Sequence, residues 1–163
     1  MTKIHIQKIL DVYYRAMLAS YFGSGQNNNV MTIENGDLTV TTYREGEDFI
    51  VTDSYKDTGG NTEIYYQGDL VWSMTYSGSY AKEAIPTLMA AIKSNMEKKI
   101  FLGGRGPEVF GHGIYVYENE VESNDPMDFR GREKIYVPGP VLEPVILGYH
   151  QYSGKANRDF VEA

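Results

Sequence analysis

The chain has 163 residues, of which 42% are hydrophobic and 13% aromatic, so it can bury the core of one folded domain and is not a disordered chain. Its net charge of -7 at pH 7 disfavours long-range attraction of nucleic acids, and we expect no direct DNA binding. The absence of cysteine excludes disulfides, zinc–thiolate sites and a cysteine nucleophile.

The first residues, Met1 to Lys8, lack the continuous apolar segment of a signal peptide. No run of about 18 apolar residues occurs anywhere in the chain, so the sequence predicts no membrane-spanning helix. We therefore expect a soluble, cytoplasmic protein without a membrane partner.

Residues 3–20 are predicted to form an amphipathic helix. Its apolar side chains recur at helical spacing along one face, at Ile6, Ile9, Leu10, Tyr13 and Met17. Thr2 is the expected N-cap of this helix, and His5 is expected to be a solvated residue of its first turn. Residues 23–29 are rich in Gly, Ser and Asn, which predicts a loop.

The next part of the chain is predicted to be β-structure. The expected strands are Val30–Ile33, Leu38–Tyr43, Phe49–Tyr55, Thr62–Tyr66 and Leu70–Tyr76. Asn35-Gly36 and Gln67-Gly68 supply turns, because glycine adopts positive φ without a Cβ clash. The connections are too short for parallel crossovers, so these strands are expected to form an antiparallel meander.

A second helix is predicted over residues 80–102, with Pro86 in its first turn and Gly103-Gly104 after its end. Strands are expected again over residues 113–121, 132–137 and 141–152. The polar residues 155–163 are expected to form a frayed tail. The order of elements predicts a single α+β domain over residues 1–154, in which antiparallel β-meanders in two β-rich halves pack with an N-terminal and a central helix.

Several stretches together resemble a bacterial family catalogued as a domain of unknown function, the one numbered 5680. The matching stretches are Thr52–Tyr55, Ile64–Gly78, Arg105–Pro107, Tyr115–Val121 and Phe129–Tyr136. The resemblance covers residues 8–150 and weakens over Val137–Gly154, which is longer and richer in proline than expected. Members occur alone or behind helix-turn-helix regulators, so the resemblance implies a fold and suggests ligand sensing, but it transfers no activity.

Two arginine loops are candidates for anion binding. The segment Leu102–Pro107 would curl its backbone N–H groups into a nest, to which Arg105 adds a bidentate donor. Arg130 and Arg132 form the second loop. A glycine helix stop and ordinary surface arginines remain the structural alternative.

Aromatic residues on the predicted strands are candidates for stacking on a planar ligand. Those assigned to ligand binding are Tyr55, Tyr65, Trp72, Tyr76 and Tyr117. Core packing with each hydroxyl hydrogen-bonded is the alternative for most of the tyrosines, and it leaves one or two for stacking.

Carboxylates in the matching stretches suggest acid–base chemistry as a further possibility. They are Asp53, Glu63, Glu118, Glu120 and Glu133, and the alternative is a structural salt bridge to an arginine. His112 and His150 lack the spacing of a metal motif, so no metal and no cofactor are expected.

These observations lead to one function hypothesis and two alternatives. We expect a non-catalytic module that binds, senses or sequesters a small anionic or nucleotide-like ligand, such as a signalling nucleotide. Its expected ligand-binding residues are the three arginines Arg105, Arg130 and Arg132, the five aromatic residues above, and two carboxylates, Glu118 and Glu133. A small hydrolase or lyase with paired carboxylates and His112, or a protein-interaction domain, are the alternatives.

A homodimer is also expected, because sheets with unpaired edge strands readily associate. An apolar run near the C-terminus supplies a candidate interface, at Val141, Leu142, Val145, Ile146 and Leu147. The alternative is that this run closes the core of a monomer.

Overall fold

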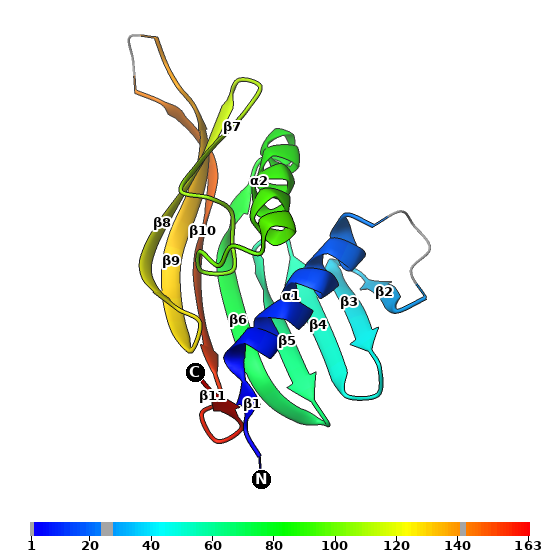
Figure 1. The fold of residues 1–163 in the computed structure, drawn as a ribbon. Helices are drawn as coiled ribbons and strands as arrows, with labels where there is room; N and C mark the ends of the chain where they lie inside the picture. The colour runs from blue at the N-terminus through cyan, green and yellow to red at the C-terminus, as the bar shows by residue number, and fades with distance from the viewer. Residues whose placement is uncertain (1, 24–27, 141–142) are drawn as a thin grey trace.

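One large sheet carries the fold. The computed structural model describes residues 2–23, 28–140 and 143–163. Within them, nine strands form a sheet in the order β2-β3-β4-β5-β6-β10-β9-β8-β7, and both helices pack on one of its faces (Figure 1). Every neighbouring pair is antiparallel, which confirms the expected α+β meander fold. We name the covered face the helix side and the other face the open side.

The strands of this sheet are β2 (Val30–Asn35), β3 (Leu38–Glu45), β4 (Phe49–Lys56), β5 (Gly59–Tyr66), β6 (Asp69–Tyr80), β7 (Val109–His112), β8 (Tyr115–Asp125), β9 (Asp128–Val137) and β10 (Val145–Ala156). The helices are α1 (Ile6–Tyr21) and α2 (Ile85–Lys98), and a 3-10 turn, η1 (Lys82–Ala84), leads into α2. β1 (Ile4–His5) and β11 (Val161–Glu162) form a separate parallel pair. In the described ranges, neither helix is long and apolar enough to cross a membrane.

The two β-rich halves join through β6 and β10. Each strand from β8 to β10 pairs with its predecessor, and β10 also pairs with β6, the last strand of the first half. In this register Tyr76 lies opposite Tyr152 and Gly78 lies opposite His150. The sheet is therefore continuous, and side chains from the two halves meet at its centre.

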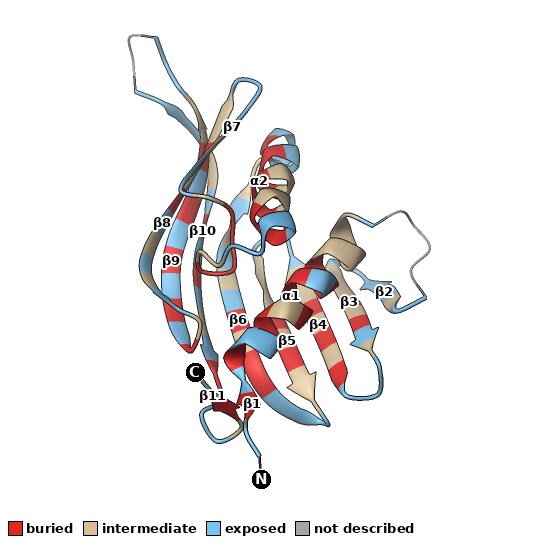
Figure 2. Ribbon diagram, viewed as in Figure 1, coloured by how far each residue is buried: buried red, intermediate tan, exposed pale blue. Residues whose placement is uncertain are grey.

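Strand alternation decides which side chains reach each face. Along β9 the residues are alternately exposed and buried from Asp128 to Ile135, as successive side chains of a strand point to opposite faces. Figure 2 shows the same alternation along β9, where exposed residues separate the buried ones. The helix side carries the core, which includes Trp72 stacked on Phe129 at a ring-centroid distance of 5.2 Å.

The hairpin turns lie where the sequence predicts them. Gly36 joins β2 to β3 with φ 64°, and Gln67 and Gly68 join β5 to β6 with φ 51° and 93°. Two successive positive φ angles belong to the tight turn whose twist matches the flanking strands.

The helix ends differ from the predictions. α1 begins at Ile6, and its N-cap is His5 and not Thr2, since His5 Nδ1 accepts a hydrogen bond from the Gln7 backbone N–H at 3.1 Å. α2 is shorter than predicted, because residues up to Tyr80 continue β6 and Lys99 ends the helix in a left-handed conformation. Pro86 lies in the first turn of α2, as predicted.

Residues 155–163 do not form a frayed tail. β10 continues to Ala156, and β11 pairs with β1 so that Ile4 lies opposite Val161. Val161 is 2% exposed, and the Ile4 N–H donates to the Phe160 carbonyl at 2.8 Å. The apolar side chains Phe160 and Val161 anchor this otherwise polar segment to the core.

Candidate functional site

Arg105 and Glu133 form a buried ion pair on the helix side. Arg105 Nε lies 3.2 Å from Glu133 Oε2, and Arg105 Nη2 lies 2.5 Å from Glu133 Oε1. Tyr117 donates its hydroxyl to Glu133 Oε2 at 2.6 Å, and His150 Nδ1 lies 3.1 Å from Oε1. Both oxygens of the carboxylate are thus occupied by protein groups.

The loop that carries Arg105 is held by its own hydrogen bonds. The Gly103 N–H donates to Asn124 Oδ1 at 2.9 Å, and the Gly106 N–H donates to the Tyr117 hydroxyl at 3.0 Å. Asn95 Nδ2 donates to the Arg105 carbonyl at 3.0 Å. These N–H groups already have protein acceptors, so the expectation that the loop forms an anion-binding nest is wrong.

Asp53 is a second buried carboxylate on the helix side. It accepts hydrogen bonds from Thr62 at 2.9 Å and from Tyr76 at 3.1 Å, and a short one from Tyr21 at the end of α1. Burial raises the pKa of Asp53, although the three hydroxyl donors oppose that rise.

Tyr76 connects the two carboxylates. Its hydroxyl donates to Asp53, while Arg105 Cζ lies 5.1 Å from its ring centroid and His150 lies 5.3 Å from it. The cluster of Arg105, Glu133, Asp53 and Tyr76 is thus one network, which we name the buried polar cluster. Tyr80 packs edge-on against His150 at 4.8 Å, and its hydroxyl is the one buried side-chain polar atom of the described residues that lacks a partner.

The two carboxylates have opposite pKa shifts. Burial disfavours the charged form of Glu133, but the charge of Arg105 and hydrogen bonds from His150 and Arg105 outweigh it and lower the pKa of Glu133 to about 2. The only cation of the cluster is thereby neutralised by Glu133. A free anion placed here would meet Asp53 and Glu133 without a spare positive charge, so the buried polar cluster does not suit an anionic ligand.

Arg130 and Arg132 lie on the open side. They are exposed residues of β9, whereas Glu133, the residue after Arg132, is buried on the opposite face. Arg132 makes a two-point pair with Glu120 on β8, with both distances 2.9 Å, and Arg130 Nε lies 3.3 Å from Glu122. The expectation that these arginines and Arg105 close one cleft is therefore wrong, because the sheet separates them.

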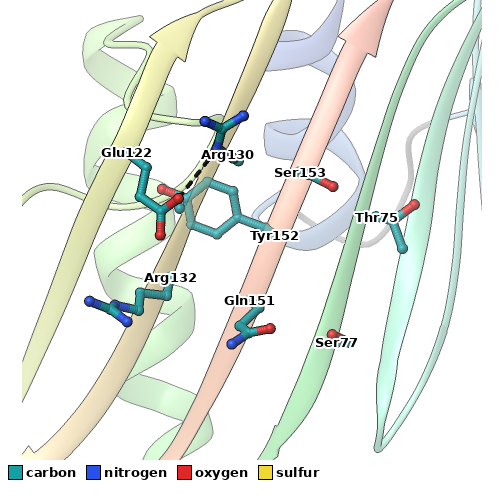
Figure 3. A pocket seen from close by; sticks show the side chains of 9 residues that line it. Thr75, Ser77, Glu122, Arg130, Arg132, Gln151, Tyr152 and Ser153 are labelled. Carbon is teal, nitrogen blue, oxygen red and sulfur yellow. Dashed lines mark hydrogen bonds and ion pairs between the residues drawn. The ribbon is translucent and has the colours of Figure 1, made fainter.

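A hollow of about 340 Å³ lies beside these arginines on the open side. In Figure 3, β9 supplies the two guanidinium groups, while β10 and β6 supply neutral polar side chains. The residues around the hollow include Arg130, Arg132, Gln151, Ser153, Thr75 and Ser77. Register explains this grouping, because Gln151 lies opposite both Arg132 and Ser77, and Ser153 lies opposite both Arg130 and Thr75.

The other candidate residues are distributed over both faces. Trp72 is 1% exposed and donates Nε1–H to the Pro126 carbonyl at 3.1 Å, so it belongs to the core. Tyr55 is half-buried near Tyr21, with ring centroids 6.2 Å apart.

Tyr65 donates its hydroxyl to Glu63 at 2.9 Å, away from the buried polar cluster. Glu118 accepts from the Tyr136 hydroxyl at 2.6 Å and pairs with Lys134 at 3.1 Å on the open side. His112 lies 3.1 Å from Thr87 of α2, whereas His150 contacts Glu133, so the two histidines have different partners.

Sequence reasoning missed the neutral side chains of the open side, Gln151, Ser153, Thr75 and Ser77. Thr75 and Ser77 lie two residues apart on β6, and Gln151 and Ser153 lie two residues apart on β10. Alternation alone therefore places the two members of each pair on the same face. What alternation does not supply is the pairing of β6 with β10, which brings the two pairs together. The same pairing makes His150 a neighbour of Tyr76, a role its isolated position in the sequence does not suggest.

The comparison with protein families gives one match, which covers β4 to β10. The family model described as "Domain of unknown function (DUF5680)" matches residues 49–154. No curated protein and no solved structure matches the chain. The matched range includes the buried polar cluster and the hollow, but not α1. Because it spans more than half of the 163 residues, the chain belongs to the family described as domain of unknown function DUF5680.

Proposed function

We propose that this domain is a non-catalytic module that binds a small anionic ligand in the hollow on the open side. One observation carries the proposal: two guanidinium groups, one carboxylate (Glu122) and four neutral polar side chains surround a hollow of about 340 Å³, so its lining keeps an excess of positive charge. Known small-molecule sites have volumes of roughly 300–1,000 Å³. The hollow lies at the lower end of this range, which suits a ligand of the size of a sugar phosphate or mononucleotide.

The arginines are available for a ligand despite their pairing with glutamates. The side chains of the Arg130–Glu122 pair are 62% and 50% exposed, and those of the Arg132–Glu120 pair are 57% and 65% exposed. Exposed ion pairs contribute about 0–1 kcal/mol at most. A phosphate or carboxylate that binds a guanidinium at two points would therefore displace a glutamate at little cost.

Neutral side chains would recognise the rest of the ligand. Thr75, Ser77, Ser153 and Gln151 offer hydroxyl and amide groups that both donate and accept hydrogen bonds. Tyr149 precedes Gln151 by two residues on the same face of β10 and is 56% exposed. Its ring would stack on a base, so a nucleotide-like ligand fits with its phosphate at Arg132 and its base toward Tyr149.

The position of the paired carboxylates favours binding over catalysis. Asp53 and Glu133 have opposite pKa shifts of the kind found in acid–base pairs. Both are buried beneath the helices, on the opposite face of the sheet from the hollow. A ligand in the hollow would therefore not reach them, and we expect it to leave unchanged.

Calorimetric titration with inorganic phosphate, a hexose phosphate and nucleoside monophosphates tests the proposal. Arg132→Gln removes one charged donor, so we expect affinity for the best of these probes to fall by about 10- to 100-fold. Arg44→Gln is the matched control, because Arg44 is an exposed arginine of β3 that does not line the hollow.

The absence of binding by every probe, or equal affinity of Arg132→Gln and the wild type, would overturn the proposal. Mass spectrometry of the recovered ligand separates the alternatives: an unchanged ligand supports a binding module, and a converted ligand shows an enzyme.

A further inference from the structure

β2 is an edge strand of the large sheet, with β3 as its one neighbour in the described chain. Five of its six residues are exposed, from Met31 to Asn35. The strand contains no proline and no lysine, and its register with β3 has no bulge. Natural proteins usually protect an edge with such features or with charged side chains, of which β2 has only Glu34.

The backbone groups that face outward from β2 follow from its register. The Arg44 N–H donates to the Asn29 carbonyl at 2.9 Å, and Val30 lies opposite Tyr43. Hydrogen-bonded pairs alternate along an antiparallel ladder, so Met31, Ile33 and Asn35 also direct their N–H and C=O groups toward β3. The corresponding groups of Val30, Thr32 and Glu34 therefore point away from the sheet.

The side chains of β2 also divide by face. The Thr32 hydroxyl lies 3.3 Å from that of Thr41, a buried residue of the helix side. Met31 and Ile33 consequently lie on the open side, where they are 55% and 54% exposed. A strand added at this edge would cover part of both apolar side chains.

β2 is complementary to itself in one register. A two-fold axis beside Thr32 places Thr32 opposite its own copy and Val30 opposite Glu34 of the second copy. These positions are the ones whose backbone groups point away from β3, so the pairing forms about six hydrogen bonds. The same register places Met31 opposite Ile33 of the second copy, where closely spaced apolar pairs stabilise a sheet.

Other two-fold registers are less favourable. An axis beside Glu34 opposes two like charges, and an axis beside Val30 leaves Glu34 unpaired. An axis beside Met31 or Ile33 engages only two of the three outward-facing residues of β2, so it forms about four hydrogen bonds within the strand instead of six. The opposite edge, β7, has four residues to the six of β2.

We propose that the domain forms a homodimer through antiparallel pairing of β2 with β2 of a second copy, with the two-fold axis at Thr32. The two sheets then form one continuous sheet, and the open-side hollows of both copies stay accessible, because Arg132 lies on β9, several strands away from β2.

Sedimentation velocity across a dilution series, with parallel amide hydrogen exchange, tests this interface. We expect a species of twice the 18.4 kDa chain mass that dissociates on dilution. Amides of Val30, Thr32 and Glu34 should become protected as the dimer forms, whereas those of Met31 and Ile33 should be protected at every concentration.

Two variants locate the interface. Thr32→Pro removes an outward-facing N–H, which an edge strand tolerates, and we expect the dimer dissociation constant to rise by about 10- to 100-fold. Ile33→Lys, on the exposed open side, is the second variant in case Thr32→Pro unfolds β2. Ile146→Asp is the matched control, since Ile146 is 51% exposed on β10 and belongs to the apolar C-terminal run.

A mass of one chain at every concentration would overturn the proposal. So would a dimer that Ile146→Asp dissociates while Thr32→Pro and Ile33→Lys leave it intact, because the interface would then lie at the C-terminal run.

Discussion

Arg105 and Glu133 contact each other at two points, Nε to Oε2 at 3.2 Å and Nη2 to Oε1 at 2.5 Å, although 28 residues separate them in the chain. Both side chains are buried, with 7% and 0% of their surfaces exposed. The pair joins the loop after α2 to the centre of β9. Its geometry assigns Arg105 to holding this loop on the sheet.

Breaking this pair from one side should destabilise the protein strongly. Arg105→Met leaves Glu133 charged and buried, and the loss of one partner of such a pair costs about 3–5 kcal/mol. The double variant Arg105→Met/Glu133→Met removes both charges, so its free energy of unfolding should lie well above that of the single variant. Urea denaturation followed by circular dichroism measures both. Equal destabilisation by the single and double variants would contradict a coupled pair.

The low pKa of Glu133 predicts a stability that falls at acid pH. Its pKa is lowered from 4.5 to about 2, so the folded state favours the ionised form. The resulting stabilisation is present above pH 4.5 and is lost as the pH falls toward 2. It amounts to roughly 3 kcal/mol.

Urea denaturation at a series of pH values would show this decline in the wild type. In Glu133→Gln the part of the decline between pH 4.5 and 2 should disappear. Glu122→Gln, at an exposed carboxylate, is the control and should retain the wild-type profile. A Glu133→Gln profile parallel to that of the wild type would exclude Glu133 as the source.

Asp53 should have the opposite effect to Glu133 on how stability changes with pH. Its pKa is raised in the folded state by burial, so the stability it contributes is greatest when it is protonated and decreases as the pH rises through its folded pKa. The free energy of unfolding of Asp53→Asn, measured from pH 4 upward, should therefore decrease less with pH than that of the wild type. A steeper decrease in Asp53→Asn would contradict the raised pKa.

Removing a buried tyrosine hydroxyl should lower the stability of the fold more than removing a partly exposed one. Tyr117→Phe removes the donor to Glu133 and the acceptor of the Gly106 N–H, so we expect a loss of about 1–3 kcal/mol. Tyr65→Phe removes a half-exposed hydroxyl that donates to Glu63, and should change stability by less than about 0.5 kcal/mol. Thermal unfolding of the two variants compares them directly, and equal effects would argue against the special role of Tyr117.

The sequence predicts the helices, the hairpins at Gly36 and Gly68, and the α+β class, because periodicity and turn chemistry are local. Alternation along 128–135 also separates Arg132 from Glu133, and applied strictly it would have divided the expected cleft. The pairing of β6 with β10 is different, since it places Tyr76 opposite Tyr152 through backbone hydrogen bonds between strands that are far apart in the sequence. Local patterns carry no information on that contact, and both the buried polar cluster and the hollow depend on it.

The segments 24–27 and 141–142 lie outside the described residues, so the predicted loop over 23–29 and the role of Val141 and Leu142 stay predictions. Of the same apolar run, Val145 and Ile146 are 60% and 51% exposed. They do not close the core of the domain, and this exposure makes Ile146→Asp an informative control for the dimer.

Mapping of amide chemical-shift changes by NMR, during titration with the tightest-binding phosphate compound, tests the proposed site most directly. If the open-side hollow binds the ligand, the largest changes will lie at Gly131, Arg132, Gln151 and Ser77, and Arg132→Gln will abolish them at the same ligand concentration. Largest changes at Tyr21, Asp53 and Tyr76, with the hollow unaffected, would contradict it and place binding on the helix side.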